Sequence, residues 1–364
     1  MDFDFSDDQL QLREAVARWV DKAYPFERRR EIERSGGFSR EVWGELAELG
    51  LTGLAVPEDQ GGMGMGPVEA MVVMEELGRG LVLEPLAQAL ICGRVLSQLA
   101  PQSPWLAKLA AGQAVLSLAW QERGGRYRAA HCQTLAEGDR LNGTKSVVAA
   151  GDQADAFIVS ARRGGLIALY LVESGAAGLS RHGYGTQDGG RAAELHLKDT
   201  PAQLLAADGL AALEEALDMG AACACAEGVG AMDKSLAITA DYMNQRKQFG
   251  VAIASFQALR HRLADMKMQL ELGRSMSYYA WLKLLSPAAE RTQAVARAKV
   301  QLGQAMRLVG QQSVQLHGGI GVTDEYIISH YFKKLTQLEL SFGDSLHHLG
   351  QVSERMQETA GVFA

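Results

Sequence analysis

Apolar residues recur every three or four positions through the first part of the chain, which is the spacing of one face of a helix. Ser6, followed by two aspartates, is suited to cap the first of these helices, and Ser39 to cap another that Gly50 ends. Four glycines over residues 61–66 indicate a turn before the next helix. The pattern predicts an N-terminal α-helical domain over residues 1–112.

The pattern changes after residue 112 to short apolar runs separated by glycine, aspartate and asparagine. Runs of this length and spacing are typical of β-strands joined by tight turns. Asn142-Gly143 is strongly favoured in two-residue hairpin loops, so a hairpin turn is expected there. Residues 113–205 are therefore predicted to form a compact antiparallel β-barrel or sandwich.

From residue 206 onward helix-forming residues dominate again, in segments long enough for extended helices. Long helices with short joins predict an up-and-down arrangement, here a C-terminal four-helix bundle over residues 206–364. The expected fold class is α+β and multidomain, with a helical domain, a middle β-barrel domain and a helical bundle domain.

Composition agrees with several domains of an ordinary globular protein. A chain of 364 residues exceeds one simple core, and 47% hydrophobic with 22% charged residues is a typical balance. The net charge of −7 argues against nucleic acid as a partner, and no apolar run reaches the roughly 20 residues that span a bilayer. The acidic N-terminus lacks the features of a secretory signal, so a cytoplasmic location is expected.

Neither the cysteines nor the histidines form a pattern typical of a metal site. Cys223 and Cys225 lie two positions apart in a predicted helix, so their side chains point to different sides, and no histidine is near. The adjacent His347 and His348 begin a predicted helix, where histidines more often cap the helix or face solvent. We therefore predict no metal and no disulfide framework.

Three stretches together resemble one enzyme family. Residues 45–80 join an ELAELGL helix end, a PEDQGG turn and an EELGRG helix, and residues 246–250 and 315–321 read RKQFG and QLHGGIG. On these motifs the chain resembles the acyl-CoA dehydrogenases over its whole length. The resemblance is greatest to two-subunit members, such as the small subunit of pimeloyl-CoA dehydrogenase, and to relatives that act on steroid side chains.

The resemblance implies a cofactor, a substrate and partners. Acyl-CoA dehydrogenases use FAD to desaturate the α,β bond of an acyl-CoA thioester, and they pass electrons to electron-transfer flavoprotein. Arg246 and Phe249 would contact the FAD diphosphate of a neighbouring subunit, and Gln315, Gly318 and Gly319 would form a second contact. The neighbour would be another copy of this chain, in a dimer or tetramer, or a homologous subunit.

The predicted β domain departs from the family at the motifs that hold the flavin ring. Residues 120–127, WQERGGRY, replace the family's TEPGAGSD, and residues 145–149, KSVVA, replace its Lys-x-Trp-Ile-Thr segment. The tryptophan and threonine of the second motif are gone, and Ala149 has no side-chain group that can hydrogen-bond. Either the flavin is bound through backbone groups, or this β domain has lost it.

The carboxylate that removes the α-proton is missing from both positions where the family places it. Aligning the turn at Gly343 puts Phe342 at the usual glutamate position, and Gly220 occupies the second known position. Phenylalanine and glycine cannot accept a proton.

Three substitutes for this base remain open: Asp344 or Glu339 close by, Glu214 or Glu215 before Gly220, or a partner chain. We favour the partner, because the chain keeps the contacts that reach a neighbour's FAD while it loses those that hold its own flavin ring. The leading prediction is a heteromeric dehydrogenase acting on a dicarboxylyl-, ring- or steroid-derived acyl-CoA. The alternatives are a self-sufficient homo-oligomer with a relocated base, or a catalytically silent acyl-CoA-binding protein.

Overall fold

The first helices begin at the serines that the sequence predicts. The computed structural model describes residues 5–360. Ser6 caps α1 (Asp7–Ala23) by accepting a hydrogen bond from the Gln9 amide, and the Gln9 side chain accepts one from the Ser6 amide. Ser39 caps α3 (Arg40–Glu48) through its side-chain oxygen. Both caps are confirmed.

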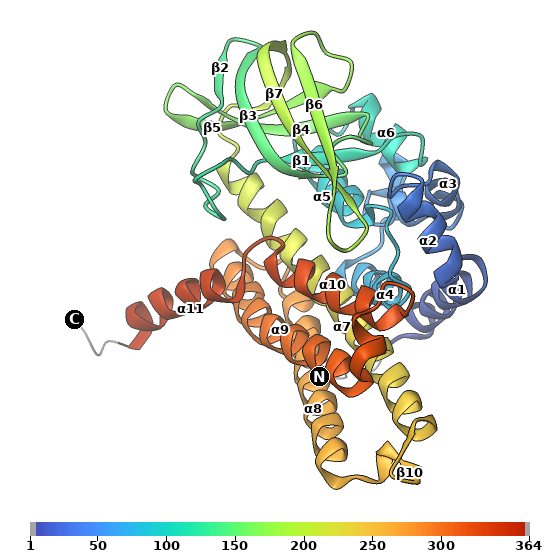
Figure 1. Cartoon of the computed structure of the whole chain (residues 1–364). Coiled ribbons are helices and arrows are strands. Elements are labelled where there is room, and N and C mark those ends of the chain that lie inside the picture. The colour runs from blue at the N-terminus through green and yellow to red at the C-terminus, as the bar shows by residue number, and fades with distance from the viewer. Residues whose placement is uncertain (1–4, 361–364) are drawn as a thin grey trace. The chain divides into compact units, whose positions relative to one another are not determined.

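The chain folds as two compact units, each assembled from several segments (Figure 1). A helical unit combines Met1–Arg29, Pro67–Val82 and Ala221–Ala364, and a β unit combines Arg30–Gly66 and Leu83–Gly220. The chain passes between the units several times, and α7 (Leu210–Gln245) begins in the β unit and continues through the helical one. No helix within residues 5–360 is both long and apolar enough to cross a membrane.

The helical unit contains the predicted C-terminal bundle, which is confirmed. Besides α1 and α7, its elements are α4 (Pro67–Arg79), β9 (Lys247–Gln248), β10 (Val251–Ala252), η3 (Ile253–Ser255), α8 (Gln257–Leu282), α9 (Ala288–His317), η4 (Gly318–Val322), α10 (Ile327–Leu340) and α11 (Ser345–Ala360). The long α9 packs against α8, α10 and α11, so it is the central helix of the bundle.

Two glycines allow α4 and α7 to approach closely. A Cβ atom at Gly78 would lie 2.0 Å from the carbonyl oxygen of Glu227, and one at Gly230 would lie 1.7 Å from that of Glu75. No side chain fits in either place, because real Cβ atoms do not approach backbone oxygens below about 3 Å. The two glycines therefore set the separation of these helices.

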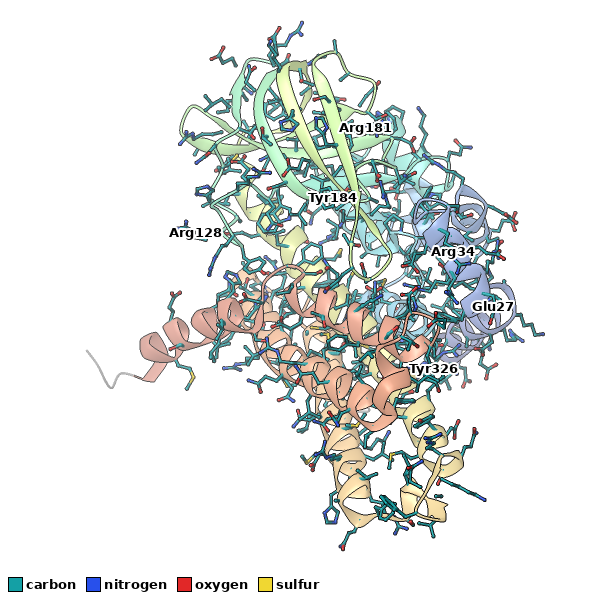
Figure 2. The ribbon with its side chains drawn as sticks, in the orientation of Figure 1. Glu27, Arg34, Arg128, Arg181, Tyr184 and Tyr326 are labelled. Carbon is teal, nitrogen blue, oxygen red and sulfur yellow. The ribbon has the colours of Figure 1, made fainter. Side chains whose placement is uncertain are left out.

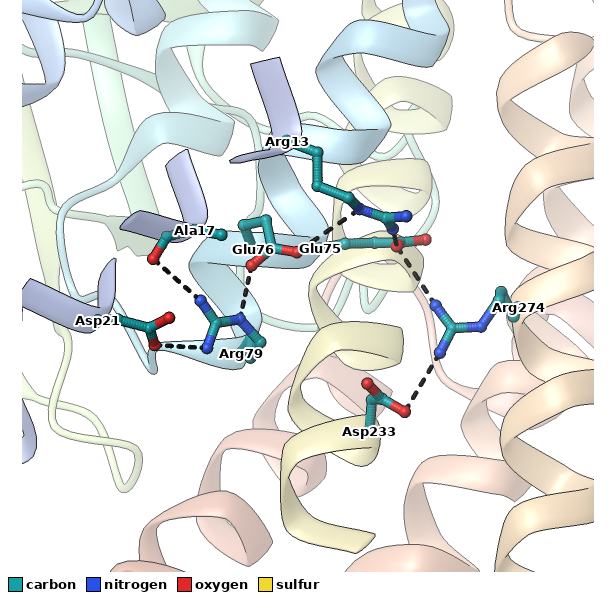
Figure 3. A network of polar contacts seen from close by, with 8 residues as sticks. All are labelled: Arg13, Ala17, Asp21, Glu75, Glu76, Arg79, Asp233 and Arg274. Atoms are coloured by element: carbon teal, nitrogen blue, oxygen red, sulfur yellow. Dashed lines mark hydrogen bonds and ion pairs between the residues drawn. The ribbon is translucent and has the colours of Figure 1, made fainter. Parts of the chain in front are cut away.

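An ion-pair network joins α1, α4, α7 and α8 within the helical unit (Figure 3). The Glu75 carboxylate on α4 is buried and lies 2.5 Å from the Arg13 guanidinium and 3.5 Å from that of Arg274. Arg274 also lies 3.3 Å from Asp233. Burial raises the pKa of Glu75, and the two guanidinium groups oppose this shift. The network thus binds the first helix of the chain to the bundle.

The β unit holds most of α2 (Phe26–Arg34), together with α3, η1 (Leu51–Gly53), η2 (Glu58–Gln60), α5 (Leu86–Leu99) and α6 (Pro104–Ala110). Its strands are β1 (Leu116–Ala119), β2 (Leu135–Glu137), β3 (Arg140–Ala149), β4 (Ala156–Arg163), β5 (Leu166–Glu173), β6 (Leu179–Gly185), β7 (Arg191–Pro201) and β8 (Gln203–Ala206).

These strands form one sheet in the order β6-β7-β3-β2-β4-β5-β8, with β1 paired to β4 (Figure 1). The middle β domain is thereby confirmed. Most pairs are antiparallel, as expected, but β4 runs parallel to both β1 and β2. The chain reverses between β2 and β3 and again before β4, so β4 runs in the same direction as β2 and β1.

The hairpin turn predicted at Asn142-Gly143 is wrong. The β2–β3 turn lies at residues 138 and 139, and Asn142 and Gly143 lie within β3. The Asn142 side chain accepts a hydrogen bond from the Asp199 amide at 2.8 Å, and the register of β3 against β7 shifts at this point. A Cβ atom on Gly143 would lie 2.5 Å from the Thr134 hydroxyl. The pair marks a bulge with close backbone approach rather than a turn.

Candidate functional site

The end of α7 carries an aromatic side chain on a strained turn. Gln248 of β9 pairs with Val251 of β10, which leaves Phe249 and Gly250 as a two-residue hairpin loop. Both loop residues have positive φ, +54° and +81°, as this tight hairpin requires, although such a φ is uncommon for phenylalanine. Phe249 is 91% exposed, and its ring forms a T-shaped contact with the Phe256 ring. The loop therefore presents an aromatic ring to solvent, three residues after the exposed Arg246.

The end of α9 is a second exposed turn. Gln315, Gly318 and Gly319 are all exposed, and no atom lies within 4 Å of the position of a Cβ on either glycine. Gly318 has φ +63° and ψ −140°, a conformation that is open essentially to glycine alone. The backbone here can thus be approached closely by a ligand.

Stacked side chains hold these two turns together. The rings of Tyr242 and His317 stack with centroids 4.3 Å apart, and the Tyr242 hydroxyl donates to the His317 carbonyl at 3.3 Å. Tyr242 lies one helical turn before Arg246, and His317 directly precedes Gly318. The structure therefore brings the RKQFG and QLHGGIG motifs to the same end of the helical unit.

His317 keeps a neutral ring at this junction. Its Nδ1 donates to the Ser313 carbonyl at 2.8 Å, since a carbonyl only accepts. Burial lowers the pKa of His317, and its Nε2 is buried with no hydrogen-bond partner among the described residues. Positive charge at this end of the unit comes from the exposed Arg246 and Lys247 rather than from the imidazole.

This end of the helical unit carries the kinds of groups that bind a diphosphate. It offers a guanidinium fork, a side-chain amide and two adjacent glycines with open Cβ positions, all exposed. Because the whole set is exposed, a phosphate ligand can reach it.

The turn after α10 holds the position where the family places its base. Phe342 has φ +56° and Gly343 φ +111°. The completely buried Lys299 on α9 donates to the carbonyls of Leu338, Glu339 and Ser341 at 2.9, 3.1 and 2.8 Å. Burial lowers the pKa of Lys299 to about 8. Lys299 thus caps the end of α10, where helix carbonyls lack partners.

His348 fixes the same turn from the other side. Burial lowers the pKa of His348 to about 3, so its ring is neutral, and Nε2–H donates to the Phe342 carbonyl at 3.0 Å. A Cβ on Gly343 would lie 2.4 Å from this Nε2. The pair predicted as surface or capping histidines therefore includes one buried ring that clamps the turn.

The carboxylates nearest to Phe342 cap α11. Glu339 is buried and accepts from the Ser345 amide at 3.1 Å and the Ser345 hydroxyl at 2.8 Å. Asp344 accepts from the His347 amide at 2.8 Å. In this structure both carboxylates hold the first turn of α11, and Phe342 itself offers no proton acceptor.

The other two named carboxylates, Glu214 and Glu215, lie on α7 in the β unit. Glu215 accepts from Arg94 at 2.8 Å and from Gln98 at 3.0 Å, which ties α7 to α5. Gly220, at the second family position, is buried within α7. Glu215 is thus engaged in packing.

A cleft of about 510 Å³ lies beside the turn, between α9, α10 and α11. Its lining is Gln304, Arg307, Leu308, Gln311, Gln312, Glu339, Leu340, Asp344, Ser345 and Leu346. Arg307 lies 3.4 Å from Glu339 across this cleft. The face of the turn that carries Asp344 is therefore accessible to small molecules.

The β unit does not fit the flavin ring in the way the resemblance implies. Ala149 ends β3 without a hydrogen-bonding side chain. Val147, at the tryptophan position, has φ +54° and is 49% exposed at a break in the β3–β7 register. A positive φ is an outlier for a β-branched residue. Val147 nevertheless has this conformation at the bulge, where the family resemblance places a tryptophan. The side-chain contacts expected to hold a flavin ring are absent at both positions.

A buried ion pair beside this bulge was not anticipated from the sequence. Lys145, which is completely buried, donates to Glu122 at 2.7 Å and to the Ser160 hydroxyl at 3.0 Å. Burial alone would raise the pKa of Glu122, but Lys145 and the other donors lower it to about 2. The sequence gives no signal for this pair, because Lys145 lies between Thr144 and Ser146 in β3 and only the fold brings Glu122 to it.

Comparisons with known proteins agree with the motifs. Residues 6–113 match the family described as "Acyl-CoA dehydrogenase, N-terminal domain", and residues 207–357 match "Acyl-CoA dehydrogenase, C-terminal domain". The chain is 31% identical over 337 residues to acyl-CoA dehydrogenase IpdE2 of Mycobacterium tuberculosis, which covers 90% of this chain and 91% of that protein.

Two solved structures share the fold over nearly the full length. A chain of the ChsE4-ChsE5 complex from Mycobacterium tuberculosis has TM-score 0.90 and 28% identity, covering 99% of this chain and 100% of that one. A chain of the Tcur3481-Tcur3483 steroid acyl-CoA dehydrogenase has TM-score 0.90 and 30% identity, covering 98% and 99%.

Proposed function

Because this chain belongs to the acyl-CoA dehydrogenase family, we propose that it is the subunit of a heteromeric, FAD-dependent enzyme that completes the FAD site of a homologous partner. Members of the family bind FAD and are oxidoreductases acting on CH–CH bonds. The partner would hold its own flavin ring and supply the carboxylate that removes the α-proton. The observation that carries this proposal is the contrast between the exposed Arg246–Phe249 turn and the absence of a base at Phe342.

FAD, when bound, would accept the hydrogen that leaves the β-carbon. This chain's own part is to hold the cofactor. Arg246 would bind phosphate oxygens through its guanidinium fork, and Gln315 would donate an amide hydrogen bond. The glycines at 318 and 319 let backbone approach the diphosphate, and Phe249 would cover it from water. Tyr242 and His317 keep the two turns in register for this task.

The missing base supports a division of labour between two chains. Glu339 and Asp344 are engaged as helix caps, so moving either toward a substrate would leave amides of α11 without their acceptor. The backbone amide of Phe342 would remain able to donate to a thioester carbonyl, because that donor does not depend on the side chain.

The proposal extends to substrate, electron acceptor and location. A dicarboxylyl-, ring- or steroid-derived acyl-CoA is proposed, supported by the likeness to a structure described as a steroid acyl-CoA dehydrogenase. Electron-transfer flavoprotein is the proposed acceptor. The proposed location is the cytoplasm, in keeping with four buried free cysteines among the described residues.

The self-sufficient homo-oligomer is the alternative, and one observation favours it. Asp344 lines an open cleft, so its carboxylate can be reached by a ligand. In that alternative the chain purified alone would bind FAD and turn over an acyl-CoA.

Co-expression tests the proposal. The chain is purified alone and together with a homologue that carries the family's glutamate, and both samples are assayed with acyl-CoA and an electron acceptor. We expect turnover only from the pair, and we expect Arg246→Gln to release FAD from it. Arg297→Gln, an exposed arginine on α9, is the matched control. Turnover by the isolated chain would show that no partner is needed.

A further inference from the structure

A basic loop follows β1 in the β unit. Residues 123–133 contain Arg123, Arg126, Arg128 and His131 and no acidic residue, although the whole chain carries a net charge of −7. The three arginines are exposed, and Figure 2 labels Arg128 on this loop. A concentration of positive charge on an acidic protein marks a surface for anions.

The loop is closed at its base by one carboxylate. Glu122, at the start, accepts from the amides of Gln133 and Thr134 at 2.5 and 3.0 Å and from the Thr134 hydroxyl at 2.7 Å. Lys145 holds the same carboxylate from inside the sheet at 2.7 Å. The ends of the loop are thereby joined, as in compact Ω-loops, which are frequently functional.

Backbone turns make the loop rigid between these ends. The amides of Gly125, Arg128 and His131 each donate to the carbonyl three residues earlier, at 3.2, 3.2 and 3.0 Å. The His131 ring packs on Gly125, where a Cβ would lie 2.6 Å from the ring. A preformed loop binds its ligand with little ordering cost.

Two of the arginines are available to a ligand. Arg123 lies 2.6 Å from Glu194 and is 81% exposed. Arg126 and Arg128, by contrast, form no hydrogen bond or ion pair with any residue that the structure describes. The Nε2 atom of His131 is buried and likewise lacks a partner among those residues.

We propose that this loop binds the phosphate groups of a CoA ester, with Arg126 and Arg128 as the main contacts. Guanidinium groups bind phosphates through paired hydrogen bonds. The 3′-phospho-ADP end of CoA carries roughly four negative charges, since a phosphate monoester alone carries about −1.5 to −2. A loop with two arginines available to a ligand suits that charge, whereas the Arg246 turn already provides a fork for the diphosphate of FAD.

The choice of a CoA ester as the ligand rests on the proposed function. The test of CoA binding, however, uses neither flavin nor turnover. The affinity of the full-length chain, in the assembly in which it purifies, is measured by titration calorimetry for CoA, for 3′-dephospho-CoA and for pantetheine, which has no phosphate. The double variant Arg126→Gln/Arg128→Gln is compared with wild type. Arg34→Gln is the matched control, because Arg34 is also exposed and lies on α2 of the same unit (Figure 2).

We expect the double variant to bind CoA about tenfold more weakly, which corresponds to ~1.4 kcal/mol. Its affinity for pantetheine should stay unchanged, and Arg34→Gln should behave as wild type. The difference should shrink as salt screens the charges.

Three outcomes would overturn the inference. They are equal CoA affinity in the double variant and wild type, a wild type that does not distinguish CoA from pantetheine, or a loss of FAD affinity without a loss of CoA affinity. None of these outcomes would show whether the chain needs a partner for turnover. Conversely, turnover by the chain without a partner would not change the CoA affinities that we expect.

Discussion

Lys299→Met is expected to destabilise the turn that carries Phe342. The ammonium group is completely buried and donates to three carbonyls at the end of α10. Methionine fills a similar volume but donates nothing, so these carbonyls lose their partner at about 1–3 kcal/mol for each one that stays buried. The gain from removing a buried charge offsets part of this loss, so we expect a net destabilisation of about 2 kcal/mol at neutral pH.

The pKa of Lys299 also determines how the stability of the folded chain changes with pH. Burial lowers the pKa of Lys299 from 10.5 to about 8 in the folded chain. Below pH 8 the lysine is protonated in both states, and its contribution is constant. Between about pH 8 and 10.5 the unfolded chain holds a proton that the folded chain has released, so stability rises with pH. The full effect is roughly 3 kcal/mol at 1.36 kcal/mol per pKa unit, and Lys299→Met should lack it.

Urea unfolding at pH 7.5 and 9.5, with wild type and Lys299→Met in parallel, measures both effects. Hydrogen exchange of the peptide over residues 338–346 supplies a local readout and should be faster in the variant. An equal gain in stability of wild type and variant between the two pH values, or unchanged exchange over this peptide, would show that Lys299 does not hold this turn.

Three further substitutions test the packing and the site. Gly230→Ala places a Cβ 1.7 Å from the Glu75 carbonyl oxygen and should lower the free energy of unfolding by about 1–3 kcal/mol. Gly44 on α3 has open space around it, so Gly44→Ala should raise the free energy of unfolding by about 0.5–1 kcal/mol. An equal effect of the two substitutions in urea unfolding would contradict the close contact between α4 and α7. Asp344→Asn should leave the turnover of the two-chain enzyme within a few fold, because Asp344 acts as a cap, and a loss of turnover with FAD retained would favour the homo-oligomer.

Local chemistry explains what the sequence could predict. The caps at Ser6 and Ser39 depend on a side chain and an amide three residues away, so they are visible in the sequence. The turns at Phe249-Gly250 and Gly318-Gly319 are likewise set by glycines at fixed positions. The long helices follow from uninterrupted stretches of helix-forming residues.

Contacts between segments distant in the chain explain the features that could not be predicted from the sequence. Asn142-Gly143 has the residues of a hairpin loop, but Thr134 and Asp199 on neighbouring segments use them for a bulge. The burial of Lys145 and Lys299 depends on Glu122 and on the α10 carbonyls, which only the fold brings near. The capping roles of Glu339 and Asp344 also appear only once α11 is placed.

The number of FAD molecules in the assembled enzyme tests most directly whether this chain completes a partner's FAD site. This chain is purified with a homologous partner that carries the glutamate, and the FAD absorbance is compared with the amount of each chain. We expect one FAD for each pair of chains, because this chain completes the partner's site and holds no flavin ring of its own. One FAD for every chain would contradict it.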